Sequence, residues 1–380
     1  MNGAAIIIVG GGVTGLSTGW WLARQGVDVL VVEKGIVGWE ASGRNGGGCS
    51  HHFSPLFREE QRLWPMMDDL LGYPTEFRPN RIRLAFDEGQ MTLYRRALEN
   101  AARQGFASDV LDARQARDLV PLAGDAVVGG YFYRFGGHAN PHQTLQAYAW
   151  SMQDHGGHLL QHTGVDGFEV SGGRVTGVRT SRGLLGCDTL VLAAGCGTGH
   201  LSRLLGCAVP MVPARAEMIV TEPLPLMPVG GVDGNGLYGR QTLRGNLAYG
   251  GGPHEWLDAT DGAVLPKSST PLMRSIASRL ARLFPGAAHA RIIRSWGGIV
   301  ENTPDGRPVI DRLPSVENAI VATMSGVGFG LSPASGRAIA ELASAGACSF
   351  ADFSTFALSR FAGLEPDWID RQGWRPTGAA

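Results

Sequence analysis

The residues of this chain with the most specific chemical purpose are three glycines near its N-terminus and the acid that follows them. Gly10, Gly12 and Gly15 come directly after a short apolar run. In this spacing, the first glycine permits a tight turn, the second lets the backbone approach a pyrophosphate, and the third lets the following helix pack against the strand. Glu33 ends the next apolar run and is placed to accept hydrogen bonds from an adenosine ribose. Together these residues predict a dinucleotide-binding site.

The sequence contains one such pattern and no convincing second one. The run 189–199 also combines an apolar strand pattern with glycines, but no acid follows at the end of another strand about twenty residues later. We therefore expect one bound dinucleotide. Its electrons must then come from a small substrate and not from NAD(P)H.

Strand and helix patterns alternate around the glycine motif, which is typical of an α/β fold with a Rossmann-type domain. A second group of strand patterns, at 210–221, 237–241 and 246–250, predicts a separate antiparallel sheet. The two domains are interleaved along the chain. The expected boundaries are 1–80, 140–208 and 290–345 for the nucleotide-binding domain, 81–139 and 209–289 for the substrate domain, and 346–380 for a C-terminal tail.

Composition and charge exclude several classes of protein. The net charge of −1 leaves no electrostatic footprint for nucleic acid, and no apolar run is long enough to span a membrane. No signal-peptide pattern is visible and the cysteines form no CxxC pair, so we expect a cytoplasmic protein with free thiols. Cys196 and His200 have no companions at metal-ligand spacing, and no metal site is predicted.

Six segments resemble, in the same order, those of the FAD-dependent amine and amino-acid oxidoreductases of the D-amino-acid oxidase type. They are 10–15 together with Glu33, 42–48, 137–141, 193–195, 303–305 and 325–333. The runs Gly-Arg-Asn-Gly-Gly-Gly and Gly-His-Ala-Asn-Pro are similar to those of catalytic subunits of heteromeric opine oxidases, D-hydroxyproline dehydrogenase, proline dehydrogenase and sarcosine oxidase. The resemblance implies a FAD-binding domain of the glutathione-reductase-like kind with an interleaved substrate domain. It also implies oxidation of the C–N bond of an amino or imino acid.

The resemblance further implies which residues hold FAD. Glu33 would hold the adenosine ribose, Val165 would meet the adenine through its backbone, and 326–331 would pass under the isoalloxazine pyrimidine. Pro333 marks the first turn of a predicted helix 333–344, whose N-terminus would stabilise reduced flavin by about 0.3–2 kcal/mol. The residues expected to contact FAD are Gly10, Gly12, Val13, Thr14, Gly15, Glu33, Lys34, Ser42, Arg44, Asn45, Gly46, Gly47, Val165, Ala194, Gly195, Asp305, Gly326, Val327, Gly328, Phe329, Gly330 and Leu331.

Three departures from the family pattern bear on the reaction. The stretch 296–301 holds no arginine to grip a substrate carboxylate and no cysteine to bind flavin covalently. Lys267 does not match the lysine with which monomeric sarcosine oxidases activate oxygen. We therefore favour a dehydrogenase that passes electrons to a partner subunit carrying a second flavin or an iron–sulfur cluster. A quinone-linked partner would instead place the protein at the periphery of a membrane. A self-sufficient oxidase that makes hydrogen peroxide, and a flavin-bearing subunit for electron relay or assembly, are the alternatives.

Flavin-dependent amine oxidation moves a hydride from carbon to flavin, so the amine must first be neutral. The substrate carboxylate also needs a cation, preferably arginine with its bidentate fork. Arg240, in a predicted strand of the second sheet, is the candidate for that role, and a surface arginine is the alternative. His51 or His52 could act as a base or polar gate beside the ring, or could cap the next helix. Glu301 lies close to the predicted ring and must have a partner or be exposed, because an unpaired buried carboxylate is costly.

Overall fold

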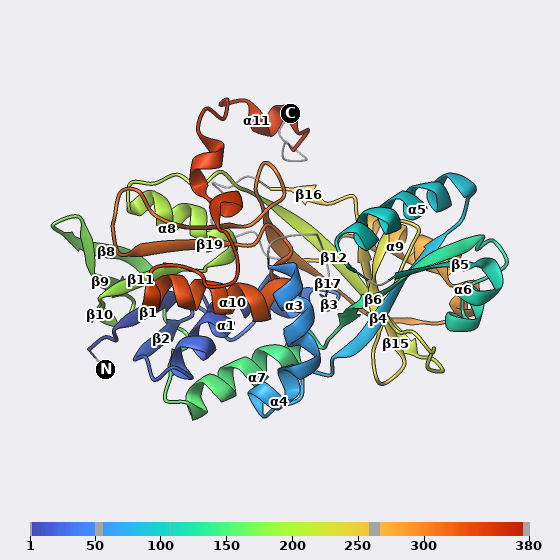
Figure 1. The fold of residues 1–380 in the computed structure, drawn as a ribbon, viewed down its shortest axis with the longest axis horizontal. Helices are drawn as coiled ribbons and strands as arrows, with labels where there is room; N and C mark the ends of the chain where they lie inside the picture. Colours follow the sequence, from blue (N-terminus) through green and yellow to red (C-terminus); the bar gives the residue numbers. More distant parts are fainter. Residues whose placement is uncertain (1, 50–55, 107, 258–266, 375–380) are drawn as a thin grey trace.

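The computed structural model describes residues 2–49, 56–106, 108–257 and 267–374. His51 and His52, two of the candidate catalytic residues, lie outside this part of the chain. Figure 1 shows two lobes side by side. The lobe on the left contains both the blue and the red ends of the chain, whereas the lobe on the right contains mainly its middle. Segments far apart in sequence therefore build each lobe.

A six-stranded sheet forms the centre of the first lobe. Its strands are β1 (Ile6–Val9), β2 (Val29–Val32), β7 (His158–Leu160), β11 (Thr189–Leu192), β18 (Val309–Arg312) and β19 (Ala319–Thr323). They follow the order β18–β19–β11–β1–β2–β7, and all neighbours are parallel except β18 with β19. Every residue of β1, β2 and β19 is buried, as expected for a sheet covered on both faces. The predicted Rossmann-type α/β fold is confirmed.

Alternate residues of β1 point into two different cores, because successive side chains of a strand face opposite sides. Ile6 and Ile8 join a core with the helices α1 (Val13–Ala23), α7 (Pro141–Asp154) and α10 (Gly328–Ala345). Ile7 and Val9 join a core beneath the helix α8 (Thr198–Leu204) and a small sheet. The strands of that small sheet are β8 (Val165–Ser171), β9 (Arg174–Thr180) and β10 (Gly183–Gly186).

Two five-stranded sheets build the second lobe. One contains β12 (Val212–Pro223), β14 (Leu237–Gln241), β15 (Asn246–Gly251), β16 (Glu255–Trp256) and β17 (Ile292–Asn302). The other contains β3 (Gly48–Cys49), β4 (Arg78–Ala85), β5 (Ser108–Asp112), β6 (Gly129–His138) and β13 (Val232–Asp233). The helices on this lobe are α5 (Glu88–Arg103), α6 (Ala113–Leu119) and α9 (Thr270–Leu283). β12 and β17 pair antiparallel along most of their length, and they reach from this lobe toward the first (Figure 1).

The remaining helices are short. They are α2 (Ala41–Arg44), α3 (Phe57–Leu63), η1 (Trp64–Met66), α4 (Met67–Leu71), η2 (Gly195–Gly197), η3 (Pro285–Ala287), η4 (Ser354–Phe356), η5 (Leu358–Phe361) and α11 (Trp368–Arg371). Trp374, after α11, stacks on Trp256 of β16 with ring centroids 4.4 Å apart, so the tail reaches the edge of the second lobe. Across the described ranges, no helix combines the length and apolar character needed to cross a membrane.

Helix α10 begins at Gly328, so the expected start at Pro333 was wrong. Proline favours the first turn of a helix because it has no N–H to donate, yet here it lies inside the helix. Tryptophan side chains from elsewhere support this stretch, because the Trp64 indole donates to the Gly330 carbonyl at 2.7 Å and the Trp21 indole donates to the Pro333 carbonyl at 3.0 Å. The N-terminus of α10 consequently falls inside the segment 326–331.

Helices α1 and α10 approach each other at Gly336, which gives a first prediction. A Cβ at this position would lie 2.0 Å from the Ser17 hydroxyl oxygen. Alanine normally stabilises a helix interior by about 1 kcal/mol relative to glycine, but we expect Gly336→Ala to lower the free energy of unfolding by about 1–3 kcal/mol because of overpacking. Denaturant titration measures the change. Ser344→Ala, on the exposed end of the same helix, should change it by less than about 0.5 kcal/mol. A more stable Gly336→Ala protein would contradict the close approach.

Candidate functional site

In the turn between β1 and α1, backbone atoms pack so closely that a side chain at Gly10 or Gly15 would clash with them. Gly10 has a φ of +121°, and a Cβ there would lie 2.3 Å from the Ala193 carbonyl oxygen. A Cβ at Gly15 would lie 2.0 Å from the Gly10 carbonyl oxygen. Glu33 is 9% exposed and accepts hydrogen bonds from the Gly11 and Gly35 amides, both at 2.7 Å. The acid therefore lies against the glycine turn, where the sequence pattern put it.

The N-terminus of α1 is arranged to receive an anion. Its first turn holds no acidic residue, and its N-cap, Gly12, offers no side-chain cap. Ser42 of α2 reaches this helix end, where its hydroxyl accepts the Val13 amide at 3.0 Å. A Cβ at Gly12 would lie 3.0 Å from that hydroxyl, so the approach depends on glycine. The positive helix end and the nearby hydroxyl together suit a phosphate group.

Two further glycines, Gly195 and Gly326, have open space beside them, as a bound cofactor requires. A Cβ at Gly326, which has a φ of +77°, would meet no atom within 4 Å, and one at Gly195 would meet only the Glu301 carboxylate, at 3.9 Å. Gly326 precedes the N-terminus of α10, and Gly195 follows β11. Phe329 and Leu331 face the core, so the segment 326–331 would contact a ligand through its backbone. These positions fit a dinucleotide that ends in a ring system.

The predicted contact residues in the glycine-rich loop after α2 are held from both sides. Arg44 donates to the Trp39 carbonyl at 2.6 Å and to the Gly297 carbonyl at 3.0 Å, and the Trp296 indole donates to the Arg44 carbonyl at 2.9 Å. Asn45 accepts the Gly47 amide at 2.7 Å and donates to two carbonyls of α2. The loop is thus fixed between α2 and β17. The side chains of Arg44 and Asn45 form their hydrogen bonds with the protein's own backbone.

The structure brings the candidate Arg240 to this same loop. Arg240 lies on β14, is 8% exposed, and donates to the Gly46 carbonyl at 2.8 Å. Burial lowers the pKa of its guanidinium to about 10, so it carries its charge at neutral pH. Within the described residues it forms no ion pair, whereas buried Arg81 nearby pairs with Asp233. Arg240 is therefore a buried cation that is available for an anionic ligand.

A neighbour of Arg240 escaped the sequence-based expectations. Tyr238 lies two residues earlier on β14, so both side chains project from the same face of the strand. A Cβ at Gly46 would lie 3.6 Å from the Tyr238 ring, which places this ring over the loop as well. The period of two along the predicted strand 237–241 was the signal that could have found it.

Glu301 is buried and has partners, as its predicted location required. Its carboxylate accepts the Thr323 hydroxyl at 3.2 Å and the Met324 amide at 3.0 Å. Burial raises the pKa of this carboxyl despite these bonds. The side chain lies between the end of β11 and the end of β19, close to the open space beside Gly195.

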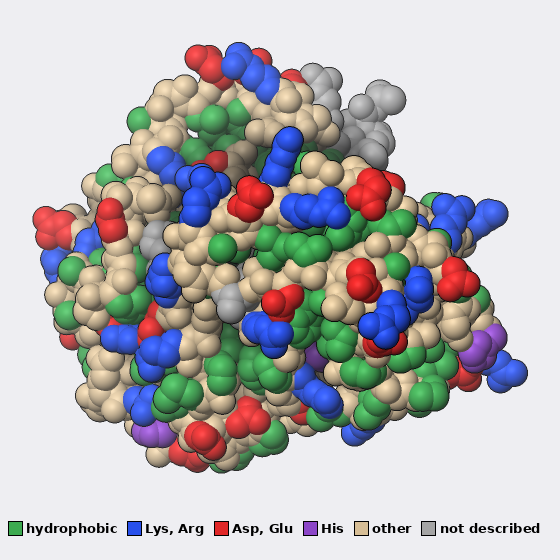
Figure 2. Space-filling view, turned by 45° about the vertical axis from the view of Figure 1, so that its right-hand side comes forward, with side chains coloured by type: hydrophobic (Ala, Val, Ile, Leu, Met, Phe, Trp, Pro, Cys, Tyr) green, Lys and Arg blue, Asp and Glu red, His purple; other side chains and the backbone are tan. Residues whose placement is uncertain are grey.

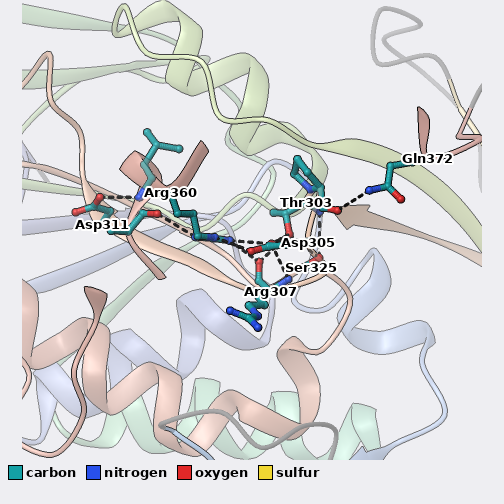
Figure 3. A network of polar contacts seen from close by, with 10 residues as sticks. Thr303, Asp305, Arg307, Asp311, Ser325, Arg360 and Gln372 are labelled. Atoms are coloured by element: carbon teal, nitrogen blue, oxygen red, sulfur yellow. Dashed lines mark hydrogen bonds and ion pairs between the residues drawn. The ribbon is translucent and has the colours of Figure 1, made fainter. Parts of the chain in front are cut away.

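Asp305 links the tail to the turn that precedes Gly326 (Figure 3). Its carboxylate pairs with Arg360 at 2.9 Å and accepts the Thr303 hydroxyl at 3.2 Å. The Ser325 hydroxyl lies 3.0 Å from the Thr303 hydroxyl and accepts the Thr303 amide. The contacts of Asp305 in this structure are thus with other residues of the chain, and a direct contact with FAD stays a prediction.

The other predicted contact residues surround the same edge of the sheet. Thr14 is buried in the first turn of α1, Lys34 is exposed after β2, and Val165 begins β8. Ala194 caps η2, and Val327 caps α10. Within the described residues, no group of three or more histidine, cysteine, aspartate or glutamate side chains could hold a metal ion. The space-filling view in Figure 2 shows acidic and basic side chains interspersed over the visible face, in keeping with the near-zero net charge.

Comparisons with known proteins agree with this geometry. A family model described as FAD dependent oxidoreductase matches residues 5–342. The beta subunit of sarcosine oxidase from Rhodobacter capsulatus is 30% identical over 96% of this chain and 90% of that protein. An opine oxidase subunit of Rhizobium meliloti is 28% identical over 84% of this chain and 88% of that protein, and the glycine oxidase of Pseudomonas putida is 29% identical over 82% and 86%.

Solved structures share the fold. L-proline dehydrogenase from P. horikoshii superposes with a TM-score of 0.87 at 24% identity, covering 96% of this chain and 99% of that one. Glycine oxidase from Geobacillus kaustophilus superposes with a TM-score of 0.87 at 24% identity, covering 95% and 99%. Both show the same fold, in which a Rossmann-type domain is combined with a second lobe of β-sheet.

The position of Glu33 gives a prediction for FAD binding. Glu33→Gln keeps the size of the side chain but removes its charge, and hydrogen bonds to a charged group are worth about 1.5–3 kcal/mol. We expect the Kd for FAD, measured by titrating apoprotein, to rise by about tenfold or more. Glu169→Gln, an exposed change on β8, should leave the Kd unchanged. An unchanged Kd in Glu33→Gln would place the ribose elsewhere.

Proposed function

The chain belongs to the FAD-dependent oxidoreductases of the D-amino-acid oxidase family, whose work is the oxidation of amines and amino acids, and on that premise we propose a narrower activity. We propose that it oxidises the C–N bond of an amino or imino acid, with a secondary amine such as an opine, hydroxyproline, proline or sarcosine as substrate. The observation that carries this proposal is Arg240, a buried and charged guanidinium at the loop 44–47 that the described residues leave without an ion pair.

In the proposed reaction, the protein positions the substrate and FAD supplies the hydride acceptor when it is bound. Arg240 binds the carboxylate and fixes the adjacent carbon relative to the loop. Tyr238, on the same face of β14, covers the substrate and helps to exclude water. The N-termini of α1 and α10 would hold the negatively charged parts of FAD, the pyrophosphate and the reduced pyrimidine, by their positive helix ends. Each of these groups acts by placement or charge, and the proton of the amine needs a separate acceptor.

The electrons are proposed to leave through a partner subunit that carries a second flavin or an iron–sulfur cluster. Two observations support this choice: several relatives are named as subunits, and the lysine expected of an oxygen-activating oxidase is not matched by Lys267. A second candidate function is a self-sufficient oxidase that forms hydrogen peroxide. The relatives named glycine oxidase favour it.

An anaerobic screen tests the proposed reaction. The FAD-loaded chain is mixed without oxygen with sarcosine, proline, hydroxyproline, opines, glycine and D-amino acids, and the flavin absorbance is followed. We expect rapid bleaching with a secondary amine and none with NADH. Bleaching by NADH alone would overturn the proposal. Peroxide formed stoichiometrically in air by the isolated chain would select the oxidase over the dehydrogenase.

Arg240 gives a prediction that separates charge from geometry. Acetate, a carboxylate without an amine, serves as the ligand and is titrated against the flavin spectrum. Arg240→Lys keeps a cation but loses the bidentate fork, so we expect the Kd for acetate to rise by about tenfold or more. The exposed change Arg294→Lys on β17 should leave this Kd unchanged. An equal Kd in Arg240→Lys and wild type would exclude Arg240 as the carboxylate ligand.

The same titration has a predicted pH dependence. Arg240 loses its charge as pH rises through its pKa of about 10, so wild-type affinity for acetate should be constant around neutral pH and fall as pH approaches that value. Lysine has a lower ordinary pKa than arginine, and burial lowers the pKa of either cation. Acetate binding by Arg240→Lys should therefore fall at a lower pH than in the wild type.

A further inference from the structure

A small cavity lies where elements of the two lobes meet. It has a volume of about 50 Å³ and is lined by residues of β3, α3, η1, β4 and β6, including Cys49, Glu60 and Gln61. A cavity needs only about 10–15 Å³ of this kind of space to hold one water molecule. The cavity is therefore large enough for water, provided that polar groups face it.

Two unpartnered polar side chains line the cavity. Glu60 is 1% exposed, and neither of its carboxylate oxygens has a hydrogen-bond partner among the described residues. The side-chain amide nitrogen of Gln61 is also buried without a described partner. Leaving such groups without hydrogen bonds costs about 1–3 kcal/mol each, and more for a charge. The lining thus calls for a polar occupant, and water satisfies both groups.

The walls of the cavity touch both segments expected to hold the flavin ring. Cys49 lies two residues after the loop 44–47, and its thiol lies 3.5 Å from the Gly47 carbonyl oxygen. Trp64, which also lines the cavity, donates to the Gly330 carbonyl in the first turn of α10. A third part of the lining, Arg134, has a side chain that is 59% exposed. The cavity therefore extends from the neighbourhood of the ring segments toward solvent.

We propose that Glu60 and a water molecule in this cavity exchange protons between the oxidation site and solvent. This role rests on the proposed function, because amine oxidation must release a proton. A bound ammonium favours the carboxylate form of Glu60, which gives its own proton to solvent. The substrate N–H bond then breaks, its electron pair stays on nitrogen, and the proton passes through the water to Glu60. FAD, when bound, would take a hydride (two electrons with one proton) from the neighbouring carbon, and Glu60 returns its proton to solvent.

Among the described residues, burial is the dominant influence on the ionisation of Glu60. Burial raises the pKa of its carboxyl well above the ordinary range. Within the described ranges, Cys49 on β3 and Arg134 on β6 line the same cavity, and Arg337 on α10 pairs with the adjacent Glu59. Arg134 pairs with Asp109, and Arg337 pairs with Glu59 and Glu341, so their charges are matched elsewhere. Burial thus favours the protonated form of Glu60, and a new cation or anion near it shifts this balance.

A redox titration tests the proposal without any amine. The midpoint potential of bound FAD is measured by reduction with dithionite against a reference dye over a range of pH. Negative charge on reduced flavin raises the pKa of Glu60 further, so reduction takes up one additional proton over part of the range. In that range we expect the midpoint potential to fall by about 30 mV more per pH unit. This equals an extra tenfold change in the equilibrium constant of a two-electron couple. Glu60→Gln should lose this extra slope.

Two matched variants separate the carboxyl from the helix that carries it. Glu60→Asp keeps an ionisable group and should retain the extra slope at a shifted pH. Glu59→Gln removes the neighbouring acid of α3, whose carboxylate is held by Arg62 and Arg337, and should leave the slope intact. Identical pH dependence in wild type and Glu60→Gln would overturn the proposal. The same loss in Glu59→Gln would overturn it too, because the effect would belong to the helix.

The rate of anaerobic flavin reduction by an amine provides the second readout. In Glu60→Gln we expect the rate to fall by about 10²-fold, the lower end for acid–base catalysis, and its pH profile to lose one ionisation. If no amine reduces the flavin of the wild type, the proposed function fails and the redox titration still decides the role of Glu60. If amines reduce both proteins equally at every pH, the proton passes elsewhere.

Thermal unfolding supplies a prediction about the resting state of Glu60. Its pKa is higher in the folded than in the unfolded chain, so its contribution to stability is full at acid pH and is lost as pH rises toward the folded pKa. Glu60→Gln has no such loss. The Tm of the variant relative to wild type should therefore increase steadily with pH. A constant difference across the range would mean that Glu60 is ionised at rest.

Discussion

The closeness of three backbone segments at one edge of the parallel sheet is the constraint on which the rest of the structure depends. β1, the first turn of α1 and the end of β11 meet at Gly10 and Gly15, where a single added carbon would lie 2.3 Å or less from a carbonyl oxygen. Gly336 brings α10 against α1 in the same way. Because these contacts fix α1 and α10 side by side, both helix N-termini reach the same edge of the sheet. The cofactor site is the consequence of that packing.

The second lobe places two buried arginines near this edge of the sheet, and they differ in whether they have a counter-ion. Arg81 and Arg240 are both buried near the loop 44–47, yet Arg81 is neutralised by Asp233 and Arg240 is left with backbone contacts among the described residues. A buried cation without a counter-ion is unfavourable in isolation. Its persistence is understandable if an anionic ligand completes it. The ladder between β12 and β17 holds the sheet in place, so Arg240 is positioned before any ligand arrives.

Much of the fold could be predicted from the local spacing of residues. The features that depend on packing between distant parts of the chain could not. The glycine motif, Glu33 and the α/β class follow from residues within one strand–helix–strand unit. The start of α10 was misplaced because Pro333 signals a first turn, whereas the indoles of Trp64 and Trp21 support a longer helix from far along the chain. Arg360 binds Asp305 from 55 residues away, which no local pattern reveals. The polar sequence of α3 likewise reads as an exposed helix, and the burial of Glu60 arises only from the elements packed around it.

Glu60 and Glu301 show why burial alone does not define the role of an acid. Both lie near segments that border the predicted ring, and burial raises the pKa of both carboxyls. The Glu301 carboxylate accepts hydrogen bonds from an amide and a hydroxyl, which hold it in one place and connect β17 to β19. Glu60 faces a cavity with none of these bonds from the described residues. An acid held by fixed protein donors suits a structural or electrostatic role, whereas an acid whose partners are exchangeable water suits the movement of protons.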